Sequence, residues 1–138
     1  MLFALMLLLT IEEFYPHYRE AFFNGKDIKG MDVYPIGNPN KIGIVKDALV
    51  DLRGRFLYLV IKVSMGKRGK QVLVPFASFL IDGNYQRVYV DSITTINLNC
   101  LPEFTHTNQV DYEYLYKVNK VYQPLIFQGE IASYGELN

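Results

Sequence analysis

The segment from Lys41 to Val63, with the sequence KIGIVKDALVDLRGRFLYLVIKV, constrains the fold more than any other part of the chain. Its second half, residues 56–63, is apolar on both faces of an extended strand except at Lys62, and a strand of that kind is covered on both sides in a folded protein. Just before it, Asp51 is a typical first residue of a turn and Gly54 adopts a positive φ without steric cost, so the two halves are predicted to form a β-hairpin. A hairpin alone is marginal in water, and the segment therefore predicts the centre of a larger sheet.

Short apolar runs bounded by turn residues precede and follow this hairpin. They predict further strands over Met31–Pro35, Gln71–Pro75, Phe79–Asp82 and Arg87–Asp91. The length of 138 residues, half of them hydrophobic, suits one compact domain with some additional chain. Because no long helix separates these runs, the sequence predicts a mainly β fold, a small antiparallel β-barrel with a short N-terminal helix and a C-terminal extension.

The N-terminal part lies outside the predicted barrel. Residues 1–9 carry no charge, and they are too few to span a bilayer, which takes about 20 residues. A buried strand or terminal helix is the favoured interpretation, a membrane contact is the alternative, and Met6 is an alternative start. Glu12–Gly25 predicts one short helix that packs an aromatic face onto the barrel.

The part after the barrel carries weaker signals. Asp91–Glu103 predicts a short helix, although its β-branched residues and asparagines make it a weak one. Val110–Gln123 has tyrosines at alternate positions, which favours an extended segment over a helix. We therefore expect an N-terminal segment and helix over residues 1–24, the barrel over residues 25–92, and a tyrosine-rich C-terminal extension over residues 93–138.

The net charge is zero, but basic residues are concentrated between Lys41 and Gln71. Among them, Lys67, Arg68 and Lys70 lie between or beside glycines at a predicted hairpin tip. These three residues are the candidate partner-binding site, because cations there are able to meet phosphates, anionic lipid headgroups or an acidic protein surface. A solvated tip that discourages edge pairing is the alternative. The charge distribution does not predict specific nucleic-acid binding.

No catalytic or metal-binding pattern is present in the sequence. His17 and His106 are far apart, and neither has neighbours at a ligand spacing. The one cysteine, Cys100, lies among apolar residues, which predicts a small buried thiol. Asp47 lacks an acid–base partner and is interpreted as structural, accepting backbone N–H groups at a turn or bulge. We therefore expect no enzyme activity, no cofactor and no metal.

Within the hairpin, the pattern G-x-V-x-D-x-x-V-D-x-x-G-R-x-x-Y-L-V resembles the PRC-barrel domain, and the resemblance is carried by Gly43, Asp47, Asp51, Gly54 and Arg55. That domain is named for the H subunit of the photosynthetic reaction centre and recurs in the ribosome maturation factor RimM. The stretches FYPHYREAFFNGKDIKGMDVY, VPFASFLIDGNYQRVYVD, NCLPEF and VDYEYLYKVNKVYQP resemble the N-terminal part of cyanobacterial stress proteins of the AvaK/YsnF type. The resemblance implies a PRC-type barrel in which these five hairpin residues are structural.

The resemblance also implies a non-enzymatic protein-interaction or scaffold module, associated with stress or photosynthesis, that docks partners through the barrel surface and the basic loop. The alternative, by analogy with RimM, is an accessory factor in ribosome or RNA maturation. We expect a homodimer, because both faces of Arg55–Val63 are apolar and the terminal segments are rich in aromatic residues. The protein partner is not identified, and the expected location is cytoplasmic, with peripheral attachment to an anionic membrane surface, thylakoid or plasma membrane, as the alternative.

Overall fold

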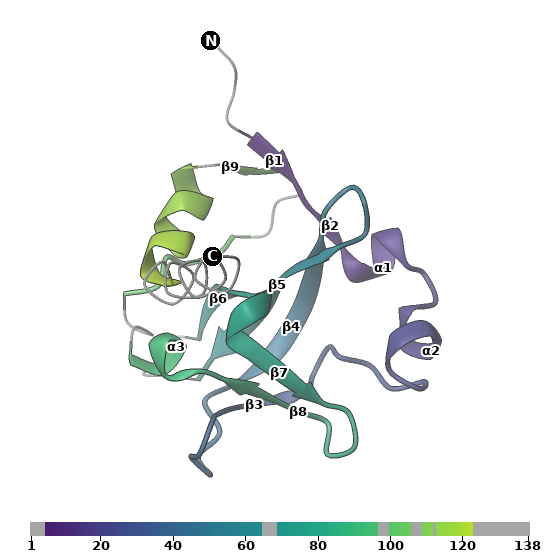
Figure 1. Ribbon diagram of the computed structural model, residues 1–138, viewed down its shortest axis with the longest axis horizontal. Coiled ribbons are helices and arrows are strands. Elements are labelled where there is room, and N and C mark those ends of the chain that lie inside the picture. The colour runs from purple at the N-terminus through teal and green to yellow at the C-terminus, as the bar shows by residue number, and fades with distance from the viewer. Residues whose placement is uncertain (1–4, 65–68, 97–99, 106–108, 112, 123–138) are drawn as a thin grey trace, which may run out of the picture.

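The computed structural model describes residues 5–64, 69–96, 100–105, 109–111 and 113–122, and strands dominate it (Figure 1). One sheet consists of seven strands: β2 (Leu9–Thr10), β3 (Asp32–Pro35), β4 (Gly43–Val50), β5 (Phe56–Val63), β6 (Lys70–Pro75), β7 (Phe79–Asp82) and β8 (Arg87–Val90). A second sheet pairs β1 (Leu5–Leu7) with β9 (Gln109–Asp111). The helical elements are α1 (Ile11–Phe14), α2 (Tyr18–Phe22), the 3₁₀ turn η1 (Phe76–Ser78), α3 (Ser92–Ile96) and a helix over residues 113–122. The prediction of a mainly β fold is confirmed.

The predicted hairpin is formed by β4 and β5. Its register runs from Gly43 opposite Val63 to Val50 opposite Phe56. β6 pairs with the other edge of β5, and β3 and β2 pair with the other edge of β4. The residues of β5 from Leu59 to Ile61 are at most 2% exposed, so a single chain covers both apolar faces of this strand.

The strand directions differ from the predicted antiparallel arrangement at one place. β3 and β8 are parallel, with Asp32 opposite Arg87 and Pro35 opposite Val90. All the other strand pairs among the described residues are antiparallel. The parallel pair is possible because β4 to β7 lie between the two strands in the sequence, and a parallel pair requires a long connection of that kind.

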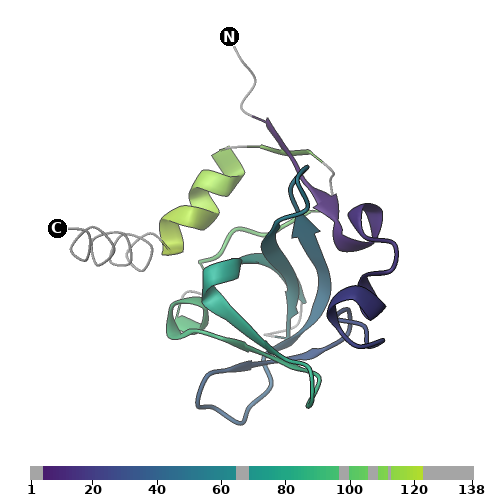
Figure 2. The ribbon, with the colours of Figure 1, turned by 45° about the vertical axis from the view of Figure 1, so that its right-hand side comes forward.

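The sheet curves strongly (Figure 2). Its strand order is β6-β5-β4-β3-β8-β7, and no ladder joins β6 to β7 among the described residues. Pro75, at the end of β6, has no N–H to donate, and the chain then turns through η1 before β7 begins. The predicted barrel is thus a curved sheet whose two ends are connected by a turn.

Residues 1–4 lie outside the described part of the chain, and the strands β1 and β2 agree with the favoured interpretation for residues 5–9, although Leu7 is 40% exposed rather than buried. Leu8 is 2% exposed, and β2 pairs with β4 through Leu9 opposite Val50. The predicted helix over Glu12–Gly25 is wrong in its continuity, since two short helices stand in its place. Because Pro16 disfavours a helical conformation in the residue before it, α1 ends ahead of Tyr15. No helix in the described ranges combines the length and hydropathy that a membrane span requires.

The prediction of an extended segment over Val110–Gln123 is wrong for most of its length. Only β9 is extended, and residues 113–122 form a helix. Leu115, Val118 and Tyr122 are at most 3% exposed and recur at helical spacing, so the face formed by these residues outweighs the alternation of the tyrosines. Cys100, predicted to be buried, is exposed.

Candidate interaction site

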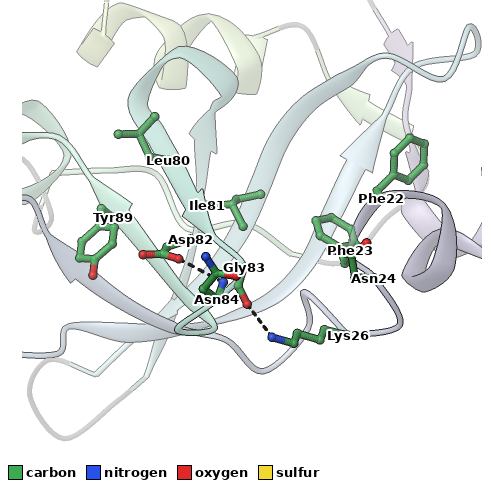
Figure 3. A pocket seen from close by; sticks show the side chains of 10 residues that line it. All are labelled: Phe22, Phe23, Asn24, Lys26, Leu80, Ile81, Asp82, Gly83, Asn84 and Tyr89. Carbon is green, nitrogen blue, oxygen red and sulfur yellow. Dashed lines mark hydrogen bonds between the residues drawn. The ribbon is translucent and has the colours of Figure 1, made fainter.

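A groove of about 850 Å³ lies between β7 with its following turn and the chain that leaves α2 (Figure 3). Phe22, Phe23, Asn24 and Lys26 form one wall. The other wall consists of residues 80–84 with Tyr89 of β8 beside them, and Ile81 points across the groove towards the phenylalanines.

One end of the groove is closed by a hydrogen bond between its walls. The Lys26 ammonium donates to the Gly83 carbonyl at 3.0 Å. Gly83 is held by a tight turn, in which the Asp82 Oδ1 accepts from the Asn84 N–H at 3.1 Å. Asn24, with φ of 52°, reverses the chain after α2 and brings Lys26 to this position.

Large apolar side chains on this side of the molecule remain exposed. Leu80 is 64% exposed, Phe76 60%, Phe22 45% and Ile81 38%. Phe22, Leu80 and Ile81 line the groove, and Phe76 of η1 lines a neighbouring cavity that Ile81 also borders. Exposed apolar side chains that gather in one region are typical of surfaces that bind another molecule.

A second cavity, of about 150 Å³, lies beside the groove between β5 and β7. Phe56, Phe76, Phe79 and Ile81 contribute to its lining, which is almost wholly apolar. Ile81 borders both spaces. Its lining comes from β4, β5, η1 and β7 together with Ile28, so the cavity lies on the inner side of β7.

An aromatic cluster attaches the α2 wall to the hairpin. Tyr15 donates from its hydroxyl to the Gly54 carbonyl at 2.9 Å. Its ring lies 4.9 Å from that of Phe22, which in turn lies 5.3 Å from that of Phe56, both centroid to centroid with edge-on geometry. The hairpin turn therefore fixes the position of the groove wall.

Charged groups fix the other end of the same wall. Tyr18 donates to the Asp27 Oδ1 at 2.6 Å, and Arg19 forms an ion pair with the Asp27 Oδ2 at 2.9 Å. Burial tends to raise the pKa of Asp27, but the hydrogen bonds from Tyr18 and the Lys29 N–H, with the Arg19 charge, outweigh it and lower that pKa. The loop that carries Lys26 is thus tied to α2.

The predicted partner-binding residues lie elsewhere. Lys67 and Arg68 are outside the described residues. Lys70 is the first residue of β6, opposite Val63, and is partly buried. Lys70 is not among the residues that line the groove.

The hairpin residues act within the fold. Asp47 lies at a β-bulge and accepts from the Ala48 N–H at 2.8 Å. A Cβ atom at Gly43 would meet the Lys62 carbonyl, so only glycine fits this crossing of strands.

Asp51 organises the turn of the hairpin. It accepts from the N–H groups of Arg53 and Arg55, both at 2.9 Å, and from the Arg55 Nε at 2.7 Å. These hydrogen bonds lower the pKa of Asp51, and the bond from the Arg55 N–H has the largest effect.

The groove is not predicted from the sequence, because its two walls are distant in the chain: Lys26 and Gly83, which are hydrogen-bonded to each other, are 57 residues apart. The available signal was that Leu80 and Ile81 place apolar side chains on both faces of a short strand. Of the two histidines, for which the sequence predicts no catalytic or metal-binding role, His17 is exposed and His106 is outside the described residues. Among the side chains described, no group of three or more His, Cys, Asp or Glu is placed to hold a metal ion.

Residues 20–95 match the family model of the PRC-barrel domain. This region is just over half of the chain, and it contains the whole hairpin and both walls of the groove. A search among curated proteins returns no match.

Proposed function

The chain belongs to the PRC-barrel family, and on that premise we propose that it is a non-catalytic module that binds a partner protein in the groove along β7. The observation that carries the proposal is the exposure of Phe22, Leu80 and Ile81 along the groove and of Phe76 at the cavity beside it. Leaving such side chains in water is unfavourable by about 25 cal/mol per Å² of apolar surface, and a partner removes that cost.

The mixed character of the groove supports a protein partner rather than a small molecule. Its wall carries Asn24, Lys26 and the turn at Asn84 beside the apolar residues. Protein interfaces combine an apolar centre with a polar rim in this way, whereas small-molecule sites are more enclosed.

Affinity capture with quantitative mass spectrometry tests the proposal. The groove variant changes Leu80 and Ile81 to Ser, and the control variant changes Ile36 and Leu52 to Ser, since these two residues are also exposed but do not line the groove. We expect the groove variant to lose the partners that the wild type and the control retain. Retention of every partner by the groove variant contradicts the proposal.

A third variant, with Lys67, Arg68 and Lys70 changed to Ser, tests the basic loop in the same experiment. Loss of partners only in this variant moves the binding site to that loop. If ribosomal proteins dominate the captured set, the alternative of a factor in ribosome or RNA maturation replaces the leading proposal. An association with stress or photosynthesis stays a prediction until the partner is identified.

The homodimer also stays a prediction, and its basis has changed. The apolar faces of β5 are covered within one chain, so we propose the exposed apolar residues of the groove as the surface for self-association. Light scattering that shows a monomer at micromolar concentration contradicts a dimer. For the predicted peripheral membrane contact, the test is flotation with anionic liposomes, and no flotation contradicts it.

A further inference from the structure

The backbone of β7 offers unpaired hydrogen-bonding groups to the groove. β7 is the last strand of the sheet, and its one ladder partner in the described chain is β8. The Asp91 N–H donates to the Ser78 carbonyl, while the Val90 carbonyl accepts from the Ile36 N–H instead of from β7. Because bonded and non-bonded pairs alternate along an antiparallel ladder, the N–H and C=O groups of Phe79 and Ile81 point away from β8.

Among the described residues, none forms a backbone hydrogen bond with the outward N–H and C=O groups of Phe79 and Ile81. Exposed edges of this kind template the addition of another strand, and proteins normally protect them with charges, proline or a covering segment. β7 instead carries the exposed apolar residues Leu80 and Ile81. The edge therefore has the backbone groups and the apolar surface that an added strand requires.

The 150 Å³ cavity supplies a place for one side chain of such a strand. Phe79 and Ile81 lie opposite Val90 and Val88, which are fully buried, so they are on the inner face of the sheet. A side chain of an added strand on that same face enters the cavity that Phe79 and Ile81 line. Cavities of about 150 Å³ with apolar linings accept a group of the size of benzene, and this volume suits one branched aliphatic or aromatic side chain.

Lys26 supplies a charge at the closed end of the groove. Its ammonium has three donors, of which the Gly83 carbonyl accepts one. No acidic side chain of the described residues forms an ion pair with it. A carboxylate on the bound segment near this end would therefore be favoured.

The shape of the groove distinguishes a single strand from a second folded copy. Phe22 and Phe23 stand across from Ile81, so the α2 wall faces β7 across the groove (Figure 3). A second copy would have to bring its own α2 wall into the same space. One extended segment has no such bulk.

We propose that the groove receives one extended segment of a partner protein, an inference that rests on the proposed function. The segment pairs with Phe79 and Ile81 as an additional strand, places an aliphatic or aromatic side chain in the cavity, and carries a carboxylate that meets Lys26.

Selection from a display library of short random peptides against the full chain tests this inference. We expect the enriched peptides to share apolar residues at alternate positions and an acidic residue at a fixed spacing from them. The best such peptide, synthesised with a fluorescent label, is the probe for anisotropy measurements on the variants.

Position 81 separates backbone pairing from side-chain packing. Ile81→Ala removes the side chain and keeps the N–H, whereas Ile81→Pro removes both without breaking the ladder to β8. We expect Ile81→Pro to bind the peptide at least about tenfold more weakly than Ile81→Ala, because an outward N–H bond is lost and the ring obstructs the edge. Leu52→Ser, at an exposed apolar residue outside the groove, should bind as the wild type does. Circular dichroism and thermal unfolding establish that each variant is folded.

Charge reversal at the end of the groove tests the second contact. Lys26→Glu should weaken binding of the acidic peptide about tenfold, in the range of close charge pairs at interfaces. A peptide with the acid replaced by Lys should bind this variant better than it binds the wild type.

The possible failures are distinguishable. Enriched peptides whose binding is insensitive to both Ile81→Pro and Lys26→Glu overturn the strand-addition inference, as does a selection that enriches nothing. The affinity-capture result with the groove variant still decides the proposed function in either case. A wild-type dimer that dissociates on Ile81→Pro shows that a second copy occupies the edge, and it overturns the inference of a single segment.

Discussion

Substitution of Gly54 by alanine tests how the hairpin tip meets the N-terminal helices. Gly54 has a φ of 80°, and a Cβ atom there would meet the Tyr15 hydroxyl and the Phe14 ring too closely for either to stay in place. Gly37 provides a matched control, since its φ is 79° and nothing lies within 4 Å of its Cβ position. The two substitutions therefore differ in packing but not in backbone conformation.

The expected costs follow from these contacts. A positive φ costs alanine about 1–2 kcal/mol at either position. At Gly54, moving Tyr15 and Phe14 adds about 1–3 kcal/mol, and losing the Tyr15 hydrogen bond adds about 1 kcal/mol. We expect Gly54→Ala to lower the free energy of unfolding by roughly 3–6 kcal/mol, and Gly37→Ala by roughly 1–2 kcal/mol, on these terms.

Urea denaturation of the two variants measures the difference. The same pair is then made in a background with Phe14→Ala and Tyr15→Ala, where the space around Gly54 is open and its substitution should cost no more than that of Gly37. Equal costs at Gly54 and Gly37 in the wild-type background would refute the packing of the turn against α1. An extra cost at Gly54 that persists in the truncated background would assign it to some other cause.

Three further predictions concern the core and the C-terminal helix. Burial raises the pKa of Tyr122 to about 12 from 10.0, so the protonated side chain stabilises the fold below pH 10.0, and this contribution, up to about 3 kcal/mol, is lost as the pH rises towards 12. In urea denaturation at alkaline pH, Tyr122→Phe should lack this part of the loss of stability. Parallel losses in the wild type and the variant would contradict the pKa shift. Asp47→Ala should lower the free energy of unfolding by about 1–3 kcal/mol, because the buried Ala48 N–H loses its acceptor. Asp47→Asn keeps an acceptor oxygen and should retain most of the wild-type stability. Equal chemical-denaturation midpoints for Asp47→Ala and the wild type would argue against the role of this bond. Leu115→Ala should lower the free energy of unfolding by about 2–5 kcal/mol in the same assay. Tyr116→Ala, at a 65% exposed residue, should change the free energy of unfolding by no more than about 0.5 kcal/mol. A small effect at Leu115 would mean that the helix over residues 113–122 does not pack on the core in solution.

The parts of the fold that the sequence predicts are those with local causes. Asp51 and Gly54 define a turn by their own chemistry, and the two apolar runs that pair in the hairpin lie directly on each side of that turn in the sequence. The helix over residues 113–122 is not predicted because its tyrosines alternate as in a strand while Leu115, Val118 and Tyr122 recur at helical spacing. Only in the folded chain does the burial of Leu115 and Val118 decide between the two patterns. Likewise, the groove requires Lys26 and Gly83 to meet across the sheet, which depends on the whole topology.

The parallel pairing of β3 with β8 has a consequence for the order in which the chain folds. During synthesis, β3, the hairpin and β6 emerge one after another and are able to pair with close neighbours in sequence. The second edge of β3 stays open until Arg87–Val90 has left the ribosome. Closing so long a loop is slow, and an open strand edge invites pairing with other chains in the meantime. A nascent chain that pauses before Arg87 is therefore most exposed to aggregation, and synthesis of β8 ends that period.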